Sequence, residues 1–138
     1  MENQNSGGAS PERKSTAPYR YFTEEEFKKL TPSCSLSDMD VDFMRRLDYA
    51  RHIAGFPFVL NCAYRSPAWE KMKGRVNKDG EATSFHTKGL AVDIRCTDGK
   101  QRARLIWSLW YAGIPGIGVY KSFIHADGRK EPCVFYGE

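Results

Sequence analysis

The sequence predicts an α+β fold in which helices pack on a small antiparallel sheet. Three observations predict this class. Helical and β-prone segments are mixed without a regular alternation, the last three β-prone segments are joined by glycine-bearing turns, and no internal repeat is present. The chain has 138 residues, the size of one ordinary domain, so it can bury a core without disulfides or a metal.

The first eighteen residues, MENQNSGGASPERKSTAP, are predicted to be a disordered N-terminal lead, with one domain over residues 19–138. They are rich in Gly, Ser, Pro, Asn and charge, and cannot bury enough apolar surface to offset the entropy of ordering. They also lack the apolar run of a secretory signal, so we expect synthesis in the cytoplasm without a signal peptide. No segment approaches the length of a membrane span.

Two helices are predicted in the first half of the chain. In YRYFTEEEFKKL, Thr23 followed by Glu26 is a capping-box signature. Residues 37–54 form the second predicted helix, and Gly55 follows as its stop. The apolar residues of this helix recur at four, three and four positions, which predicts one buried face: Phe43, Leu47, Ala50 and Ala54.

Two further helices are predicted later in the chain. Ser66 and Pro67 form the N-cap and first-turn pattern of a short helix, SPAWEKMKG, and a polar loop, GRVNKDGEATS, follows it. DGKQRARLIWSLWYAG reads as a helix that ends before Gly113. Four of its residues recur at helical spacing: Ala103, Ile106, Trp107 and Trp110. Of these, Trp107 and Trp110 are expected to pack in the core.

The β-prone segments complete the predicted sheet. FPFVLNCAY, residues 56–64, is apolar and too short for a buried helix, so it is predicted to be a central strand. LAVDIRC is predicted to be a strand with Leu90, Val92 and Ile94 on one face and Asp93 on the other. Finally, GIGVY, FIHA and CVFY are predicted to be three short strands.

Charge and cysteine usage exclude some classes of site. The net charge of +4 is a mild basic excess without a block of like charges, which suits an anionic polymer such as a cell wall or a nucleic acid. The chain has no CxxC pair, which argues against a zinc knuckle or a redox motif. We therefore predict reduced, buried thiols at the four cysteines: Cys34, Cys62, Cys96 and Cys133.

Two of the three histidines stand in patterns that can bind a metal. His125 and Asp127 lie two residues apart in a predicted strand and so point to the same face. A turn after His86 could fold its ring over the face that carries Asp93. Two histidines and a carboxylate, with a fourth position open to water, describe a catalytic zinc site better than a structural one. His52 reads as a solvent-facing helical histidine.

The same spacing also fits a simpler interpretation. His86 and His125 could be histidines satisfied by their own neighbours, with Asp93 a charge at a strand edge. Spacing alone leaves the metal site and this alternative equally open.

The segment SFHTKGLAVD resembles the S-x-H-x-x-G-x-A-x-D signature of the zinc D-alanyl-D-alanine carboxypeptidase family, which includes vancomycin-resistance dipeptidases and phage endolysins. All fixed positions match: Ser84, His86, Gly89, Ala91 and Asp93. AYRSP resembles the family's Y-R-S-P motif, and GIGVYKSFIHAD resembles its glycine-rich strand pair ending in H-x-D. The motifs keep the family's order over about residues 20–136.

This resemblance implies a hedgehog/D,D-peptidase-like fold for a zinc peptidase domain, with Zn²⁺ bound by His86, Asp93 and His125. It implies that Arg65 binds a substrate carboxylate or polarises the scissile carbonyl. Asp127 would hydrogen-bond a nearby ligand or basic group, or carry the proton in catalysis.

Tyr64 and Ser84 would be supporting residues that shape the active-site cleft and orient a metal ligand. At Ser122 the chain departs from the better-known members, which place Glu or Asp three residues before the last histidine ligand. A serine cannot act unaided as the general base, so the substitutes are Asp127, then Glu131, Asp79 or Glu81.

The implied function is hydrolysis of an amide bond next to a D-amino acid in peptidoglycan, as a carboxypeptidase or cross-link endopeptidase of the phage-lysin type. The expected partners are stem peptides or cross-links of the wall rather than nucleic acid, and the expected state is a monomer. Two alternatives stay open: a zinc-containing wall-binding module that lost catalysis through Ser122, and a small basic adaptor without metal.

Overall fold

In this computed structural model, residues 18–137 are described, and they form an α+β fold of four α-helices and one five-stranded sheet. The predicted disordered lead lies outside the described residues except for Pro18. None of the helices within residues 18–137 is long and apolar enough to cross a membrane.

The N-terminal helices follow their capping signals. Helix α1, Glu24–Lys28, begins at Thr23, whose side chain accepts a hydrogen bond from the Glu26 N–H. The short 3₁₀ helix η1, Leu36–Asp38, precedes α2, Val41–Ala54. Helix α2 therefore begins four residues later than predicted, because Asp40 caps it. It ends as predicted at Gly55, which is left-handed with φ 83°.

The sheet has the strand order β1-β2-β4-β3-β5. Its members are β1, Leu60–Cys62; β2, Ala91–Arg95; β3, Gly116–Val119; β4, Phe123–Asp127; and β5, Cys133–Tyr136. Neighbours pair antiparallel except β3 and β5, which are parallel, so the sheet is mixed rather than purely antiparallel. The prediction of a central strand at residues 56–64 is wrong: β1 is a three-residue edge strand. Pro57 cannot donate to a ladder, which restricts pairing at the start of this segment.

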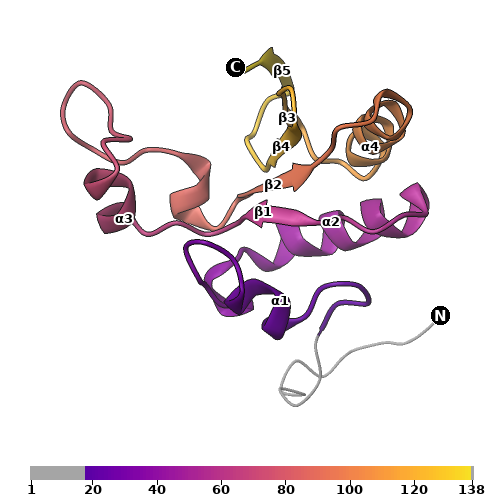
Figure 1. The fold of residues 1–138 in the computed structure, drawn as a ribbon, viewed down its shortest axis with the longest axis horizontal. Helices are drawn as coiled ribbons and strands as arrows, with labels where there is room; N and C mark the ends of the chain where they lie inside the picture. The colour runs from indigo at the N-terminus through magenta and orange to yellow at the C-terminus, as the bar shows by residue number, and fades with distance from the viewer. Residues whose placement is uncertain (1–17, 138) are drawn as a thin grey trace.

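One face of the sheet is covered by helices and the other carries the polar residues. In the β2–β4 pair, Val92 lies opposite Ala126 and Ile94 opposite Ile124. All four are buried in the core cluster with the inner side of α2. Helix α3, Pro67–Met72, and the loop after it lie at one end of the molecule, and α4, Gly99–Tyr111, lies at the other (Figure 1).

Two predictions about burial are wrong. Trp107 and Trp110 are 52% and 51% exposed, and α4 instead buries Leu105 and Leu109. The helix is apolar on more than one side, so its period does not identify the face that meets the core. Cys133 is exposed, whereas the other three cysteines are buried, and all four are free thiols.

Candidate metal centre

The register of two strands brings Asp93 and His125 together. They are Cα partners in the antiparallel β2–β4 pair, on the face away from the helices. His125 Nδ1 lies 3.1 Å from Asp93 Oδ1. Asp93 is nearly buried: burial would raise the pKa of its carboxyl, but the neighbouring His125 and His86 hold that pKa well below its usual range.

His86 is held by a one-turn 3₁₀ helix, η2, Phe85–Lys88. Ser84 caps this helix by accepting from the His86 N–H, and Gly89, at φ 70°, ends it. A Cβ at Gly89 would collide with the Asp38 carbonyl oxygen, so the signature glycine allows a close approach of two loops. Ser84 and Gly89 therefore fix the two ends of the short helix that carries His86.

The ring of His86 presents an unused nitrogen to Asp93. Its Nδ1 donates to the Ala63 carbonyl at 2.6 Å, since a carbonyl can only accept. Nε2 therefore carries the free lone pair of the neutral ring. This nitrogen is buried without a hydrogen-bond partner, lies 3.4 Å from Asp93 Oδ1, and belongs to a side chain that is 2% exposed. A buried, oriented lone pair of this kind is what a metal ligand requires.

His125 is oriented from its far side by Asp127. Its Nε2 donates to Asp127 Oδ2 at 2.7 Å, which turns Nδ1 toward Asp93. Burial lowers the pKa of His125, but its bonds to the two carboxylates raise it above the usual value overall. A metal at the Asp93 oxygen would replace the proton on Nδ1.

Asp127 is fully buried, and its carboxylate is fixed by hydrogen bonds from Arg129. Arg129 donates to both of its oxygens, at 2.8 Å from Nε and 2.7 Å from Nη2. The Arg129 guanidinium lies over the rings of Phe85 and Phe135, at 5.2 and 5.3 Å from their centroids. A Cβ at Gly116 of β3 would overlap the Asp127 carboxylate, so this glycine makes room for the pair. The sequence analysis missed Arg129, although its place two residues after Asp127 was a usable signal.

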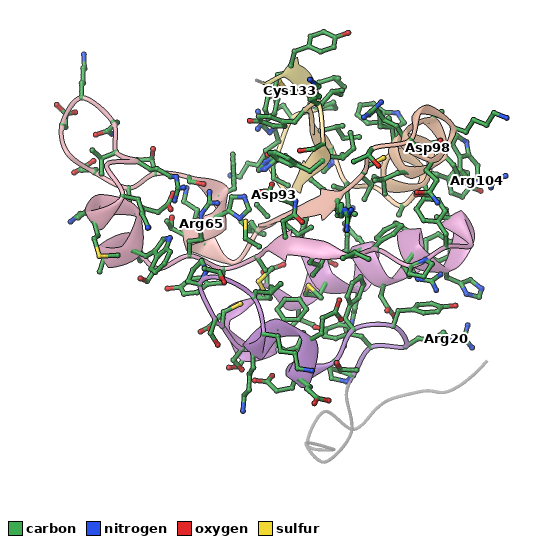
Figure 2. All side chains as sticks on the ribbon, in the orientation of Figure 1. Arg20, Arg65, Asp93, Asp98, Arg104 and Cys133 are labelled. Carbon is green, nitrogen blue, oxygen red and sulfur yellow. The ribbon has the colours of Figure 1, made fainter. Side chains whose placement is uncertain are left out.

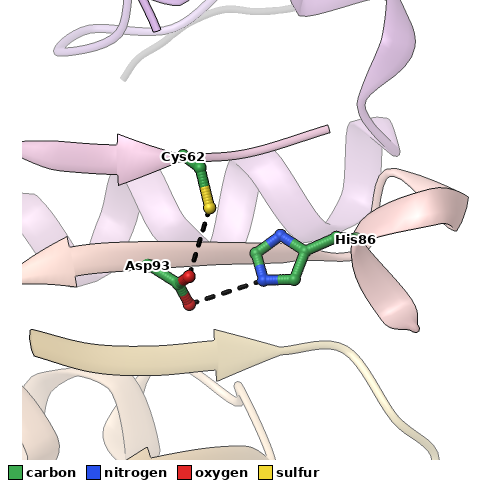
Figure 3. A group of neighbouring side chains, drawn as sticks. All are labelled: Cys62, His86 and Asp93. Carbon is green, nitrogen blue, oxygen red and sulfur yellow. Dashed lines mark hydrogen bonds and ion pairs between the residues drawn. The ribbon is translucent and has the colours of Figure 1, made fainter. Parts of the chain in front are cut away.

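Cys62 is a second residue that the sequence analysis missed, because no cysteine stands within the histidine motifs. It pairs with Asp93 across the β1–β2 ladder, and its Sγ lies 3.1 Å from Asp93 Oδ2. Donor atoms of Cys62, His86 and Asp93 all lie within 4.8 Å of one another (Figure 3). Burial, followed by the charge of Asp93, raises the pKa of the Cys62 thiol to about 12.

Arg65 lies beside this cluster (Figure 2). Its backbone N–H donates to the His86 carbonyl at 3.2 Å, and its Nη1 donates to Cys62 Sγ at 3.2 Å. Its Nε is 3.0 Å from an oxygen of Glu70, an ion pair in which the N–H is not aimed at that oxygen. Glu70 is 1% exposed and also pairs with Arg75 at 3.3 Å. Glu70 was not predicted; a carboxylate one helical turn after the N-cap Ser66 was its only sequence signal.

The other predicted residues lie further from the cluster's polar contacts. Tyr64 is partly buried against the core. Ser122 is exposed in the turn before β4, where its carbonyl accepts from the Cys96 N–H. The substitutes for a proton carrier, Asp79, Glu81 and Glu131, are all exposed.

The donor set fits zinc. His86 Nε2 and His125 Nδ1 each approach the same carboxylate oxygen, Asp93 Oδ1, and the other nitrogen of each ring donates to an outer partner. Borderline-soft Zn²⁺ accepts nitrogen and oxygen ligands of this kind, and three protein ligands leave a position for water.

Two comparisons with known proteins bear on this site. A family model described as Peptidase M15 matches residues 20–127, which include every site residue discussed above except Arg129, Glu131 and Phe135. A search of curated proteins finds no match.

Proposed function

The chain belongs to the peptidase M15 family of zinc-dependent peptidases, and on that premise we propose that it hydrolyses an amide bond next to a D-amino acid in bacterial peptidoglycan. The substrate would be a stem peptide or a cross-link, and the setting a phage-type cell-wall lysin. The observation that carries the proposal is the buried Nε2 of His86, which has no hydrogen-bond partner and faces Asp93 Oδ1.

We assign His86 Nε2, Asp93 Oδ1 and His125 Nδ1 as the zinc ligands. When bound, zinc polarises the scissile carbonyl and makes its water a nucleophile near neutral pH. The chain's own residues prepare the ligands: the Ala63 carbonyl fixes the tautomer of His86, and Asp127 fixes that of His125.

Arg65 is proposed to bind a carboxylate of the substrate or to polarise its carbonyl. The guanidinium is placed by Glu70 and Cys62, and it lies next to the zinc ligands. Its permanent charge and forked donors suit either task.

The geometry of Asp127 favours orienting His125 over carrying a proton. Both oxygens already bind Arg129 and one also binds His125, and the side chain has no exposed surface. The carboxylates left for proton transfer are Asp79 and Glu81, on the loop after α3, and Glu131. This arrangement also supports a second candidate function, a zinc-containing module that binds wall peptides without cutting them.

Digestion of purified sacculi, read by mass spectrometry, tests the proposal and names the bond. We expect new amino and carboxyl termini, about one zinc per chain, and loss of cleavage after chelation or in His86→Ala. The matched control is His52→Ala, which removes an exposed histidine of α2. Zinc and wall binding without new termini on several wall chemotypes would leave the binding module; a parent chain without zinc would overturn both.

A further inference from the structure

The two oxygens of Asp93 face different partners. Oδ1 is approached by His86 Nε2 at 3.4 Å and His125 Nδ1 at 3.1 Å, the two nitrogens assigned to zinc. Oδ2 is 3.1 Å from Cys62 Sγ, and Figure 3 shows the contacts of Cys62 and His86 ending on separate oxygens. The sulfur thus contacts one oxygen of Asp93, and the two histidine contacts are to the other.

The direction of the Cys62 hydrogen bond is set by a second contact. Arg65 has only donors, so its Nη1, at 3.2 Å, must use a lone pair of the sulfur. The thiol proton is then free to point at Asp93 Oδ2. Arg65, Cys62 and Asp93 form a one-way chain of donors that ends on the carboxylate.

The other buried cysteines lack this relationship. Cys34 Sγ and Cys96 Sγ have only long contacts to backbone carbonyls, at 3.9 and 3.7 Å. Among the cysteines of residues 18–137, only Cys62 has hydrogen bonds to charged side chains, and one of these is a residue assigned to the metal.

We propose that Cys62 is a positioning residue for the metal: its thiol holds Asp93 Oδ2 so that Oδ1 points between His86 Nε2 and His125 Nδ1. Cys62 also hydrogen-bonds Arg65, the proposed substrate-binding residue, so one side chain positions both Arg65 and Asp93. The inference rests on the proposed zinc site. Mutation of a residue that hydrogen-bonds a metal ligand and orients it typically lowers metal affinity by about 10- to 100-fold.

Zinc affinity of the purified protein, measured by competition with a chromogenic chelator, tests this role. We expect Cys62→Ala to weaken zinc binding by about 10- to 100-fold, because the donor to Oδ2 is lost. Cys62→Ser keeps a donor at the same place and should restore most of the affinity. The matched control, Cys96→Ala, removes an equally buried thiol without a contact to the site and should bind zinc like the parent.

Two results would overturn the proposal. Equal zinc affinity in Cys62→Ala and the parent would mean that the thiol only fills space. A thiolate-to-metal charge-transfer band in the cobalt-substituted parent that is absent from Cys62→Ser would make Cys62 a direct ligand instead. These measurements need no peptide cleavage, so an inactive protein with the expected affinity order would refute the proposed hydrolase and leave the role of Cys62 intact.

Discussion

Asp127 accepts a hydrogen bond from His125 Nε2 at 2.7 Å while it binds Arg129 through both oxygens. These contacts explain how one carboxylate can orient His125, a proposed zinc ligand, without being available to the substrate. Its burial makes the arrangement rigid, because neither oxygen can turn to water.

The first prediction concerns this carboxylate. Asp127→Asn removes the charge that holds His125 and leaves Arg129 without its ion-pair partner. We expect zinc affinity to fall by about 10- to 100-fold and the free energy of unfolding by about 3 kcal/mol, the low end for a broken buried pair, because Arg129 is a quarter exposed. Chelator competition and urea unfolding measure the two effects. Unchanged zinc affinity would contradict the orienting role.

The second prediction is an acid dependence of the metal-free protein. Burial would raise the pKa of Asp127, but hydrogen bonds from Arg129 and His125 hold it well below its usual range. A lowered carboxyl pKa contributes stability above the unfolded value, near 3.9, and that stability is lost as pH falls through the folded pKa. The free energy of unfolding should therefore drop below about pH 4. Asp127→Asn should show a shallower drop; equal slopes in the two proteins would refute this assignment.

The third prediction separates Arg65 placement from metal binding. Glu70→Gln removes the buried charge that anchors Arg65. We expect kcat/KM on a peptidoglycan peptide to fall by about 10- to 100-fold, as for a misplaced binding group, with zinc affinity unchanged. Arg75→Ala is the control, because Arg75 shares Glu70 but is half exposed. If Arg75→Ala is as damaging as Glu70→Gln, Glu70 does not act through Arg65.

The fourth prediction tests the space beside Asp127. In Gly116→Ala the new methyl group would overlap Asp127 and crowd Arg129 Nε, which lies 2.6 Å from the Cβ position. We expect about 1–3 kcal/mol of lost stability, the usual cost of overpacking, together with weaker zinc binding. Gly99→Ala, at the start of α4, meets nothing within 4 Å and should be neutral or slightly stabilising. Thermal unfolding of both variants, with and without zinc, makes the comparison.

The fifth prediction follows from the corrected face of α4. Trp107→Ala should cost less than about 1 kcal/mol, because half of that side chain is already in solvent. Phe27→Ala, in the core and fully buried, should cost about 3–5 kcal/mol. Urea midpoints of the two variants decide between the two environments, and similar losses would mean that Trp107 packs inside after all.

Local signals predicted the parts of the site that lie within one segment. The turn after His86 and the facing of Asp93 away from Val92 and Ile94 are both properties of a few consecutive residues. The same holds for His125 and Asp127, whose shared face follows from strand parity.

Contacts set by pairing between segments could not be predicted in this way. Cys62 joins the site only because β1 pairs with β2 in a register that includes a bulge, which no single segment specifies. Glu70 reaches Arg65 through the turn that begins α3. For α4, the choice between the side of Leu105 and Leu109 and the side of Trp107 depends on the fit to α2, so tertiary packing decided it.

At the proposed zinc site, the register of β2 and β4 makes metal binding depend on correct folding. Asp93 and His125 face each other only in the observed pairing, and a slip of one residue would turn one of them toward the helices. A mispaired sheet would therefore hold an incomplete set of ligands and bind zinc poorly. Zinc would therefore favour the correctly folded chain over mispaired forms, since the metal selectively stabilises molecules whose two strands are aligned.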